Sequence, residues 1–418
     1  MASLNSFTEK NNRIKMKHSK KNNPLLRGKY LVRNPLACLI LWSRDLLYNL
    51  VYRRANTNVN PEPQKILLSS VAHLGDVIMS SSILPYIHAL FPECEIGVLM
   101  GSWSKNVLHD HPLIKNFHYF DHWKLNRSNL SFLQKLRISK TSSKKAIEEI
   151  KAVNYDIAID LYAYFPNAIS LIHRTGIPTR IGYTSGGNGP LLTHTLDWHH
   201  INQSEVQYQA ALLRQFDPEG KYSNNLHTNL PPITKHCFES LQNILPKDQD
   251  YILIHVGTGN RLREWPVEHW TALAHLLCEN TKLPLVFTGI GNREEELIGK
   301  ITQAIPSERT INLCSSISWE QFVAVIKKAE LVLGVESVAG HVAAAVDTPS
   351  VIIGSGITNH HQWRPFSKLC RYILADNIDC MPCYRSKGCP TMDCLRNISP
   401  QIVYAEVINS LSKIPVAE

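Results

Sequence analysis

The sequence predicts an α/β protein built from two doubly wound domains. Short apolar runs typical of buried strands alternate with longer helical patterns, and this alternation occurs twice along the chain. Strands are expected at residues 65–70, 95–100, 156–161 and 180–182, and then at 251–256, 284–289, 331–335 and 351–354. A proline-containing stretch at 226–234 separates the two series. We therefore expect an N-terminal domain at residues 61–230 and a C-terminal domain at 231–418.

The first 60 residues differ in charge from the rest of the chain. The 418 residues carry 44 Lys and Arg against 35 Asp and Glu, a net charge of +9. Residues 1–60 hold 12 of these cations and two of the acids, which leaves 32 cations and 33 acids for the remainder. A basic segment on a nearly neutral body argues against a nucleic-acid-binding surface spread over the fold. Residues 1–30 are polar without apolar periodicity, so we expect them to be disordered.

A basic amphipathic helix is expected to follow within residues 36–54. Its apolar residues share one helical face, and Arg44, Arg53 and Arg54 lie nearby. These apolar residues are Leu36, Leu39, Ile40, Leu46, Leu47, Leu50 and Val51. Such a helix can lie in the interface of an anionic membrane, or it can pack on its own protein or on a partner. No uncharged apolar run approaches the roughly 18 residues of a spanning helix, and the late apolar stretch lacks the cleavage site of a secretory signal.

Three loops that follow expected strands carry residues that could bind a ligand or take part in catalysis. In doubly wound domains, ligands bind at such loops. The first loop, residues 69–76, places His73 and Asp76 at the start of an expected helix over 76–90. Asp76 is also explained as a helix N-cap without a catalytic role. The second loop contains Gly257, Thr258 and Gly259. Glycines let a ligand approach the backbone, and arginines further along this loop can pair with phosphate.

The third loop runs from a buried strand into an alanine-rich helix. The amides of its first turn suit an anionic or hydroxyl-rich ligand. Glu336 could accept hydrogen bonds from ribose or sugar hydroxyls, and His341 could donate to a phosphate. Alternatively, Ser337 is a helix cap and His341 is an interior histidine with satisfied hydrogen bonds.

Taken in order, these motifs resemble glycosyltransferase family 9, the bacterial heptosyltransferases that build the lipopolysaccharide core. The resemblance covers about residues 64–413. It rests on Leu74-Gly75-Asp76, the strand from Asp156 to Asp160, Arg180-Ile181-Gly182, His255-x-Gly257 with Trp265-Pro266, Thr288-Gly289, Ser337 with His341, and Thr348-Pro349.

The resemblance implies a GT-B architecture, in which two Rossmann-like domains face a cleft and a C-terminal return helix crosses back onto the first domain. It implies inverting transfer without a metal cofactor from a nucleoside-diphosphate donor, usually ADP-heptose. Asp76 matches the proposed general base of the family. The matching donor contacts are Thr258, Arg263, Glu294, Glu336, Ser337, Gly340 and His341.

The chain also departs from the family pattern. Glu336-Ser337-Val338 stands where Asp-Ser/Thr-Gly is common, and Arg263 replaces the usual donor-side lysine. Arginine pairs with phosphate through two parallel hydrogen bonds, whereas lysine acts as a point charge. Residues 162–166 replace a frequent Gln-Gly pair. These changes concern the donor sugar and its base more than the type of reaction. A helix N-terminus lowers the pKa of a carboxylate and so weakens it as a base. Asp76 can therefore act as the general base only if desolvation offsets this effect.

Two more features concern the acceptor and a metal. Residues 122–147 hold seven cations and no acid, which indicates a flank for an anionic glycolipid or simply a solvated helix. Acceptor-side candidates are His73, Lys140, Lys144 and Lys145.

A cysteine-rich turn at residues 380–394 could hold a structural zinc, since the ten cysteines of the chain are expected in a reducing cytoplasm. Its four cysteines are Cys380, Cys383, Cys389 and Cys394.

The leading hypothesis is a glycosyltransferase on the cytoplasmic face of the inner membrane, acting on an anionic lipid-linked saccharide, with residues 1–60 as its membrane contact. Nucleic acid is not an expected partner. The alternatives are a nucleotide-sugar epimerase of the same fold, a non-catalytic GT-B scaffold and a nucleic-acid-binding protein with a basic arm.

Overall fold

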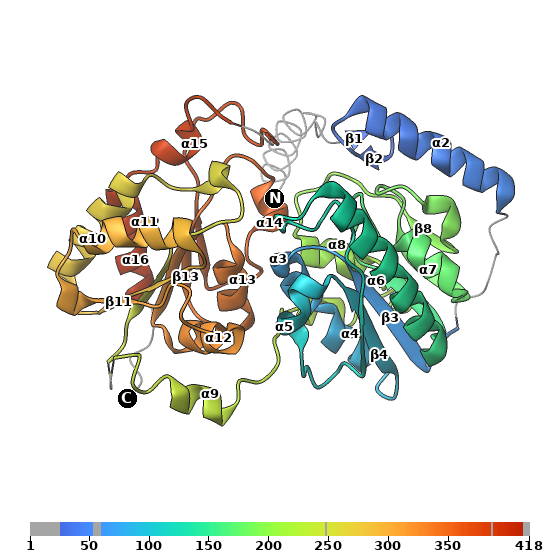
Figure 1. Cartoon of the computed structure of the whole chain (residues 1–418), viewed down its shortest axis with the longest axis horizontal. Helices are drawn as coiled ribbons and strands as arrows, with labels where there is room; N and C mark the ends of the chain where they lie inside the picture. Colours follow the sequence, from blue (N-terminus) through green and yellow to red (C-terminus); the bar gives the residue numbers. More distant parts are fainter. Residues whose placement is uncertain (1–25, 53–59, 247–248, 386–387, 413–418) are drawn as a thin grey trace, which may run out of the picture.

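The computed structural model describes residues 26–52, 60–246, 249–385 and 388–412, and Figure 1 shows two α/β lobes side by side. The first lobe contains a six-stranded parallel sheet in the order β5-β4-β3-β6-β7-β8. Its strands are β3 (Lys65–Ser70), β4 (Glu95–Met100), β5 (Asn116–Tyr119), β6 (Ile157–Asp160), β7 (Thr179–Tyr183) and β8 (His194–Leu196).

The second lobe repeats this topology, with a parallel sheet in the order β11-β10-β9-β12-β13-β14. Its strands are β9 (Ile252–His255), β10 (Leu285–Thr288), β11 (Thr310–Asn312), β12 (Leu331–Val335), β13 (Ser350–Ile353) and β14 (Cys370–Ile373). The strand order reverses between β3 and β6 in one sheet and between β9 and β12 in the other. Doubly wound sheets bind ligands beyond the strand ends at such a reversal. The predicted α/β fold is confirmed.

All eight strands expected from the sequence are present in these two sheets. The four remaining strands of the two sheets were not expected, and they are the sheet edges β5, β8, β11 and β14. The inner strands are buried on both faces and form continuous apolar runs, as β12 does with Leu-Val-Leu-Gly-Val. Edge strands such as β8, His194–Leu196, are only partly buried. They therefore contain polar residues and give no apolar run.

Helices flank both sheets. In the first lobe they are α3 (Leu74–Ser80), α4 (Ile83–Leu90), α5 (Lys105–Leu108), α6 (Phe132–Val153), α7 (Ile169–Thr175) and α8 (Glu205–Ala211). In the second they are α9 (Lys235–Ser240), α10 (Val267–Asn280), α11 (Asn292–Thr302), α12 (Trp319–Lys328), α13 (Val338–Ala345), α14 (His360–Trp363), α15 (Asp393–Arg396) and α16 (Pro400–Leu411).

Two predictions about helices need correction. The helix expected over 76–90 is split into α3 and α4, because the hydroxyls of Ser81 and Ser82 donate back to the carbonyls of Ile78 and Met79. The prediction that the C-terminal helix crosses back onto the first domain is wrong for α16. This helix packs against α10, β12, β13 and β14 of its own lobe, where Val403 and Val407 are buried.

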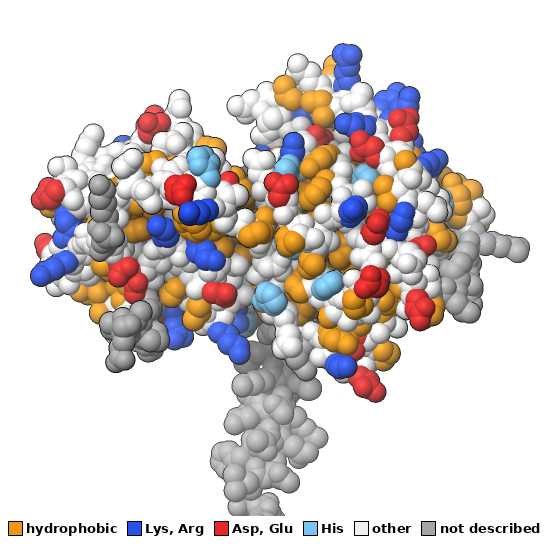
Figure 2. All heavy atoms as spheres, turned by 90° about the horizontal axis from the view of Figure 1, so that it is seen from below, with side chains coloured by type: hydrophobic (Ala, Val, Ile, Leu, Met, Phe, Trp, Pro, Cys, Tyr) orange, Lys and Arg blue, Asp and Glu red, His pale blue; other side chains and the backbone are white. Residues whose placement is uncertain are grey.

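The two lobes meet through α13 of the second lobe, which packs against α3 of the first. One cluster of buried apolar residues runs through this contact from Ile66 of β3 to Leu253 of β9. Figure 2 shows the lobes with a notch between them, and acidic and basic side chains are interspersed over the face in view.

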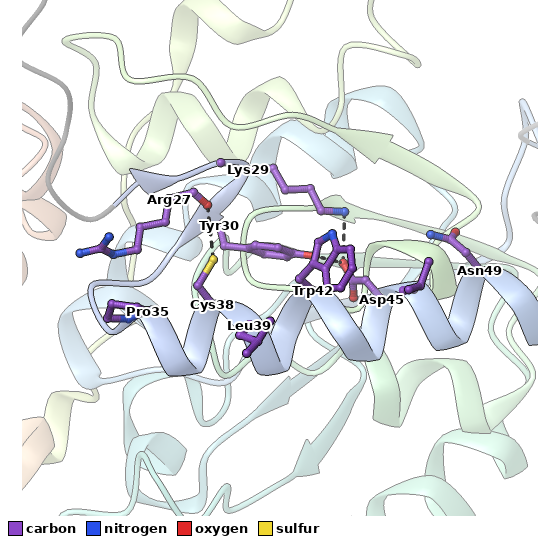
Figure 3. Close-up of a pocket in the computed structure, with 11 residues that line it drawn as sticks. Arg27, Lys29, Tyr30, Pro35, Cys38, Leu39, Trp42, Asp45 and Asn49 are labelled. Carbon is purple, nitrogen blue, oxygen red and sulfur yellow. Dashed lines mark hydrogen bonds and ion pairs between the residues drawn. The ribbon is translucent and has the colours of Figure 1, made fainter.

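The N-terminal extension begins with a hairpin of β1 (Leu26–Arg27) and β2 (Tyr30–Leu31) and continues in α2 (Pro35–Val51). Residues 1–25 of the expected disordered segment lie outside the described residues, whereas the end of that segment forms this hairpin. The carboxylate of Asp45, on α2, is buried. It pairs with Lys29 at 3.1 Å and accepts a hydrogen bond from the hydroxyl of Tyr30 at 2.8 Å (Figure 3). It also accepts a hydrogen bond from the amide of Asn188 at 2.8 Å. Asp45 thus fixes α2 to the first lobe. None of the described helices is long and apolar enough to cross a membrane.

We predict that Asp45→Ala loosens α2, because it leaves the Tyr30 hydroxyl and the Asn188 amide without their buried acceptor. The free energy of unfolding should fall by about 2 kcal/mol. Amide hydrogen exchange should accelerate within residues 35–51 first. Asn49→Ala, at an exposed position of the same helix, is the control and should change neither quantity. Equal exchange rates in α2 of the wild type and Asp45→Ala would contradict this anchoring role.

Candidate functional site

Asp76 lies at the reversal point of the first sheet, in the turn that joins β3 to α3. His73 is the N-cap of α3, and its amide donates to Oδ2 of Asp76 at 3.0 Å. Asp76 is therefore the N3 residue of a capping box, the third residue of α3, and not the N-cap itself. This contact occupies one carboxylate oxygen and sets the orientation of the side chain.

The pKa of Asp76 is raised to about 6. Burial is the largest cause, and it exceeds the opposing effects of the His73 amide and of the nearby cations Arg127 and Arg263. Desolvation thus outweighs the pKa-lowering effect of a helix N-terminus. A carboxylate with this pKa is ionised at neutral pH and is a stronger base than an ordinary aspartate.

His341 of α13 faces this turn across the cleft. A Cβ built on Gly75 would lie 2.9 Å from Cδ2 of His341, so the imidazole packs directly against the Gly75 backbone. Burial and, secondarily, Arg263 lower the pKa of His341 to about 4. Its ring is therefore neutral, with one donor and one acceptor nitrogen. The structure brings together Asp76 and His341, which are 265 positions apart in the sequence.

Arg127 is a cleft residue that the sequence did not single out. It was one of the seven cations of residues 122–147, and nothing in that run distinguishes it from the others. A Cβ on Gly259 would lie only 2.6 Å from Nη1 of Arg127, so this first-lobe side chain reaches the glycine loop of the second lobe. Arg127 also lowers the pKa values of Asp76 and His73. Tyr162, which follows β6, is partly buried near Asp76, and desolvation raises its pKa strongly.

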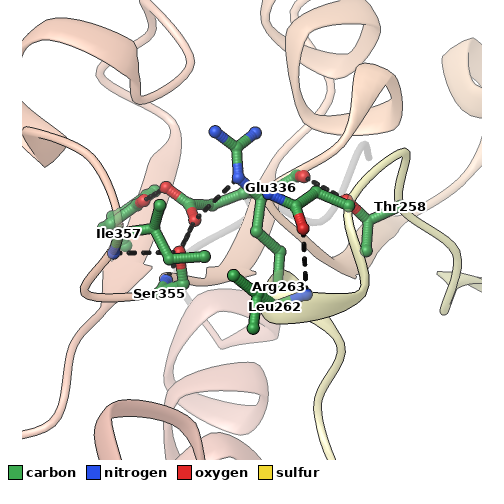
Figure 4. Close-up of polar contacts among 8 residues, drawn as sticks. Thr258, Leu262, Arg263, Glu336, Ser355 and Ile357 are labelled. Atoms are coloured by element: carbon green, nitrogen blue, oxygen red, sulfur yellow. Dashed lines mark hydrogen bonds and ion pairs between the residues drawn. The ribbon is translucent and has the colours of Figure 1, made fainter. Parts of the chain in front are cut away.

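Arg263 and Glu336 form the polar core of the donor-side loops (Figure 4). Nε of Arg263 lies 3.8 Å from Oε2 of Glu336, and Glu336 also accepts hydrogen bonds from the amide of Ser355 at 3.1 Å and from the hydroxyls of Ser355 and Tyr372. The Glu336 carboxylate thus holds the loop after β12. Within the described residues no carboxylate or carbonyl contacts the two terminal nitrogens of Arg263, so they remain available to an anion.

Other predicted donor contacts occupy the same region. Thr258 is buried, and its hydroxyl donates to the carbonyl of Glu336 at 3.1 Å. Ser337 is the N-cap residue of α13, and its buried hydroxyl has no hydrogen-bond partner among the described residues. The carboxylate of Glu294 accepts from the amide of Ile290 at 2.9 Å and lies over Gly257.

Gly340 has a packing role that the sequence did not reveal. It is buried, and a Cβ there would lie 2.9 Å from Ile352 and from Pro365. The missing side chain lets α13 approach β13 closely. Its predicted contact with the donor stays a prediction.

The acceptor-side candidates divide into two groups. His73 lies in the cleft, where burial, followed by Arg127 and Arg263, lowers its pKa to about 4. Lys140, Lys144 and Lys145 are exposed on α6. Lys144 and Lys145 lie 3.9 Å and 3.6 Å from Glu148 and Glu149, the acids that directly follow the basic run. The structure does not bring these lysines to Asp76, and the ion pairs favour the solvated-helix alternative for two of them.

The structure gives no support for the possible zinc site at the cysteine turn, as far as the described residues show. Cys380, Cys383, Cys389 and Cys394 are free thiols, and burial followed by the neighbouring cysteines raises the pKa of Cys394. Across the described part of the chain, however, no three His, Cys, Asp or Glu side chains are placed to hold a metal ion. Backbone hydrogen bonds hold the turn instead, with the amide of Cys383 donating to the carbonyl of Gly356 at 2.9 Å.

A second contact between the lobes lies near Asp76. The side-chain amide of Gln362, on α14, donates at 2.6 Å to the hydroxyl of Tyr164 and at 2.6 Å to the carboxylate of Glu205. Burial, with a smaller contribution from Asp76, raises the pKa of Glu205 to about 8 against the opposing effect of Gln362. Glu205 is therefore largely protonated at neutral pH.

Two facing doubly wound domains, with a carboxylate from one and a glycine-rich, arginine-bearing loop from the other, define an enzyme of the GT-B class. The chain belongs to glycosyltransferase family 9 (heptosyltransferase), whose sequence profile matches residues 144–392. It is therefore a glycosyltransferase of the heptosyltransferase type.

Known proteins agree with this assignment. The chain is 24% identical over 301 residues to lipopolysaccharide heptosyltransferase 1 of Campylobacter coli, covering 69% of this chain and 83% of that protein. It is 22% identical to lipopolysaccharide heptosyltransferase 3 of Escherichia coli K12, covering 74% and 87%.

Solved structures share the fold. ADP-heptose lps heptosyltransferase II of E. coli superposes with a TM-score of 0.66 at 20% identity, covering 84% of this chain and all of the other. A family 9 glycosyltransferase of Veillonella parvula gives a TM-score of 0.71 at 18% identity, covering 85% of this chain and 99% of the other.

We predict that Glu205 makes the stability of the protein depend on pH. The folded protein holds the Glu205 proton more tightly than the unfolded chain, whose glutamate pKa is near 4.5. The free energy of unfolding should therefore fall as the pH rises from about 4.5 to about 8. Glu205→Gln carries no such proton and should show a flatter dependence, with the difference exceeding about 1 kcal/mol.

Urea unfolding across this pH range measures both curves. Glu219→Gln, an exposed glutamate of the same lobe, should follow the wild type. Parallel curves for wild type and Glu205→Gln would show that Glu205 does not hold a proton in the folded state.

Proposed function

We propose that the protein transfers a heptose or related sugar from a nucleoside-diphosphate donor to a lipopolysaccharide-type acceptor, with inversion at the anomeric carbon and without a metal cofactor. One observation carries this proposal: a desolvated Asp76 on the first lobe faces Arg263, His341 and the start of α13 on the second. The relatives, a lipopolysaccharide heptosyltransferase and an ADP-heptose heptosyltransferase, support heptose as the sugar and ADP as the nucleotide.

On the donor side, the diphosphate would lie between Arg263 and the N-terminus of α13. The free nitrogens of Arg263 suit two phosphate oxygens, and the first amides of α13 and the unpaired hydroxyl of Ser337 add neutral donors. Glu336 and Thr258 would hold the loop and contact the nucleoside. Glu294, Gly340 and the neutral ring of His341 would complete the donor pocket. The positive charge that a metal ion supplies in other transferases would come from Arg263 and Arg127.

In the reaction, Asp76 would take the proton from an acceptor hydroxyl as its oxygen attacks the anomeric carbon. The new glycosidic bond forms as the bond to the diphosphate breaks, and the nucleoside diphosphate departs with the electron pair. Attack from the first lobe on a donor held by the second lobe places nucleophile and leaving group on opposite faces of the sugar. This geometry supports inversion. The cations beside the cleft then stabilise the departing charge.

The acceptor would enter from the first lobe, where His73 borders Asp76. Lys140, Lys144 and Lys145 would contact only the outer part of a large anionic acceptor. A lipid-linked acceptor also implies work at a membrane surface, and the basic N-terminal segment supports a peripheral location on the inner face of the inner membrane.

Asp76→Asn should lower kcat by about 10² to 10⁴-fold, because the amide cannot accept the acceptor proton. Donor binding, measured by the thermal shift with ADP-heptose, should persist. For the wild type, kcat/KM should rise with pH through about 6 and then level off, as Asp76 becomes ionised. Undiminished turnover of a variant that still binds donor would remove Asp76 from this role.

Arg263→Ala should weaken donor binding by about 10 to 100-fold, the loss expected for a charge-assisted hydrogen bond to phosphate. Arg263→Lys should recover part of this affinity, since lysine keeps the charge but not the paired hydrogen bonds. Arg261→Ala provides the matched control, because Arg261 is an exposed arginine of the same short helix. Titration calorimetry with ADP measures all three. An equal loss in Arg261→Ala would assign the effect to the general charge of the loop.

A further inference from the structure

The outer half of α2 is apolar and exposed. Leu36, Leu47 and Leu50 expose 63%, 57% and 79% of their surfaces, whereas Leu41 on the opposite side is buried. The helix has only two charged residues, Arg44 and Asp45, and neither is exposed. A surface helix of a globular protein normally buries its apolar residues and exposes its charged ones. A contiguous exposed apolar surface of this kind marks an interaction site.

A second exposed apolar group lies at the start of α6. Leu130, Phe132 and Leu133 expose 40%, 58% and 75% of their surfaces. Phe132 packs against Trp123, with ring centroids 5.4 Å apart.

Phe165 connects this group to α2. The cations Arg44, on α2, and Lys124, which follows Trp123, lie 5.7 Å and 4.7 Å from the centroid of the Phe165 ring. The segment between Lys124 and Leu130 carries Arg127 into the cleft. The exposed apolar groups are thus joined through residues that border the acceptor side of the site.

We propose that these two groups form a docking face for an anionic lipid bilayer. The docking face consists of the exposed apolar residues of α2 together with Leu130, Phe132 and Leu133. Apolar side chains of such a helix insert at the boundary of headgroups and acyl chains, where Trp42 also fits as an exposed aromatic residue. The proposal names the surface for the membrane location proposed above, and it rests on that location but not on the chemistry of transfer.

Charge favours a bilayer over a protein partner or a second copy of this chain. Arg27 and Lys29 of the hairpin line a groove with residues of α2. The preceding residues 1–25 contain six cations and one acid. Figure 3 shows Arg27 and Lys29 on the hairpin above Leu39 and Trp42 of α2, around a groove of about 640 Å³. Cations beside an apolar surface match an anionic headgroup layer above acyl chains.

The test is co-sedimentation of the full chain with vesicles of phosphatidylcholine and phosphatidylglycerol. Leu47→Glu combined with Leu50→Glu should reduce the bound fraction by about tenfold or more, because the charges oppose insertion. Ile402→Glu, at a half-exposed apolar residue of α16, is the matched control and should bind like the wild type. Phe132→Ser with Leu133→Ser gives a second, independent variant and should cause a smaller loss. Melting temperatures establish that each variant is folded.

Three outcomes bear on the proposal. Loss of vesicle binding with unchanged transfer to a soluble acceptor supports it. Wild-type binding by both double variants overturns it. A wild-type dimer that Leu47→Glu with Leu50→Glu converts to a monomer, without vesicle binding by either, also overturns it and assigns the face to a second copy. Because vesicle binding requires no donor or acceptor, failure here is distinct from failure of the proposed transfer.

Discussion

The packing of α13 against α3 is the contact on which the site depends. Gly75 has no side chain, and this allows the His341 ring to lie on the turn that holds Asp76. The same closeness removes water from the Asp76 carboxylate and raises its pKa to about 6. Separation of the lobes would expose Asp76 to water, leaving the His73 amide to hold its pKa low. Closure of the cleft is therefore what would make Asp76 an effective base in the proposed reaction.

Two arginines act on the pKa of Asp76 in the opposite direction to burial. Arg127 comes from the first lobe and Arg263 from the second, and both lower the pKa of Asp76. Without them, burial would raise the pKa of Asp76 further. In the proposed reaction, the same two cations would lie beside the departing diphosphate. One pair of side chains would thus favour the ionised form of the proposed base and also stabilise the leaving group. This dual role fits a site in which arginine replaces the lysine common in the family.

The sequence predicted the parts of the fold that repeat a local pattern. Inner strands such as β12 are apolar throughout and were found, whereas edge strands such as β8 are polar and were missed. Asp76 and His341 were also singled out, because each lies in a glycine-containing turn after a strand, and their roles stay predictions. Arg127 was missed because its role depends on a contact with Gly259, 132 positions further along. The cysteine spacing suggested zinc, but spacing alone does not determine where the side chains point.

The sequence also could not determine how α2 is oriented. Its apolar residues predicted an amphipathic helix, and either a membrane or the protein body could have covered that face. The structure shows that the described body of this chain leaves the face exposed, because Asp45 is a charged residue that points inward to Lys29, Tyr30 and Asn188. Because a polar anchor holds the helix, its apolar half is left outside. Arg33 of the same extension donates to the carbonyl of Tyr384 at 2.7 Å and so contacts the second lobe as well. A helix held in this way has a fixed orientation relative to the cleft, which a basic tail alone could not provide. For an enzyme whose acceptor is lipid-linked, this orientation would present the cleft to the membrane at a constant angle.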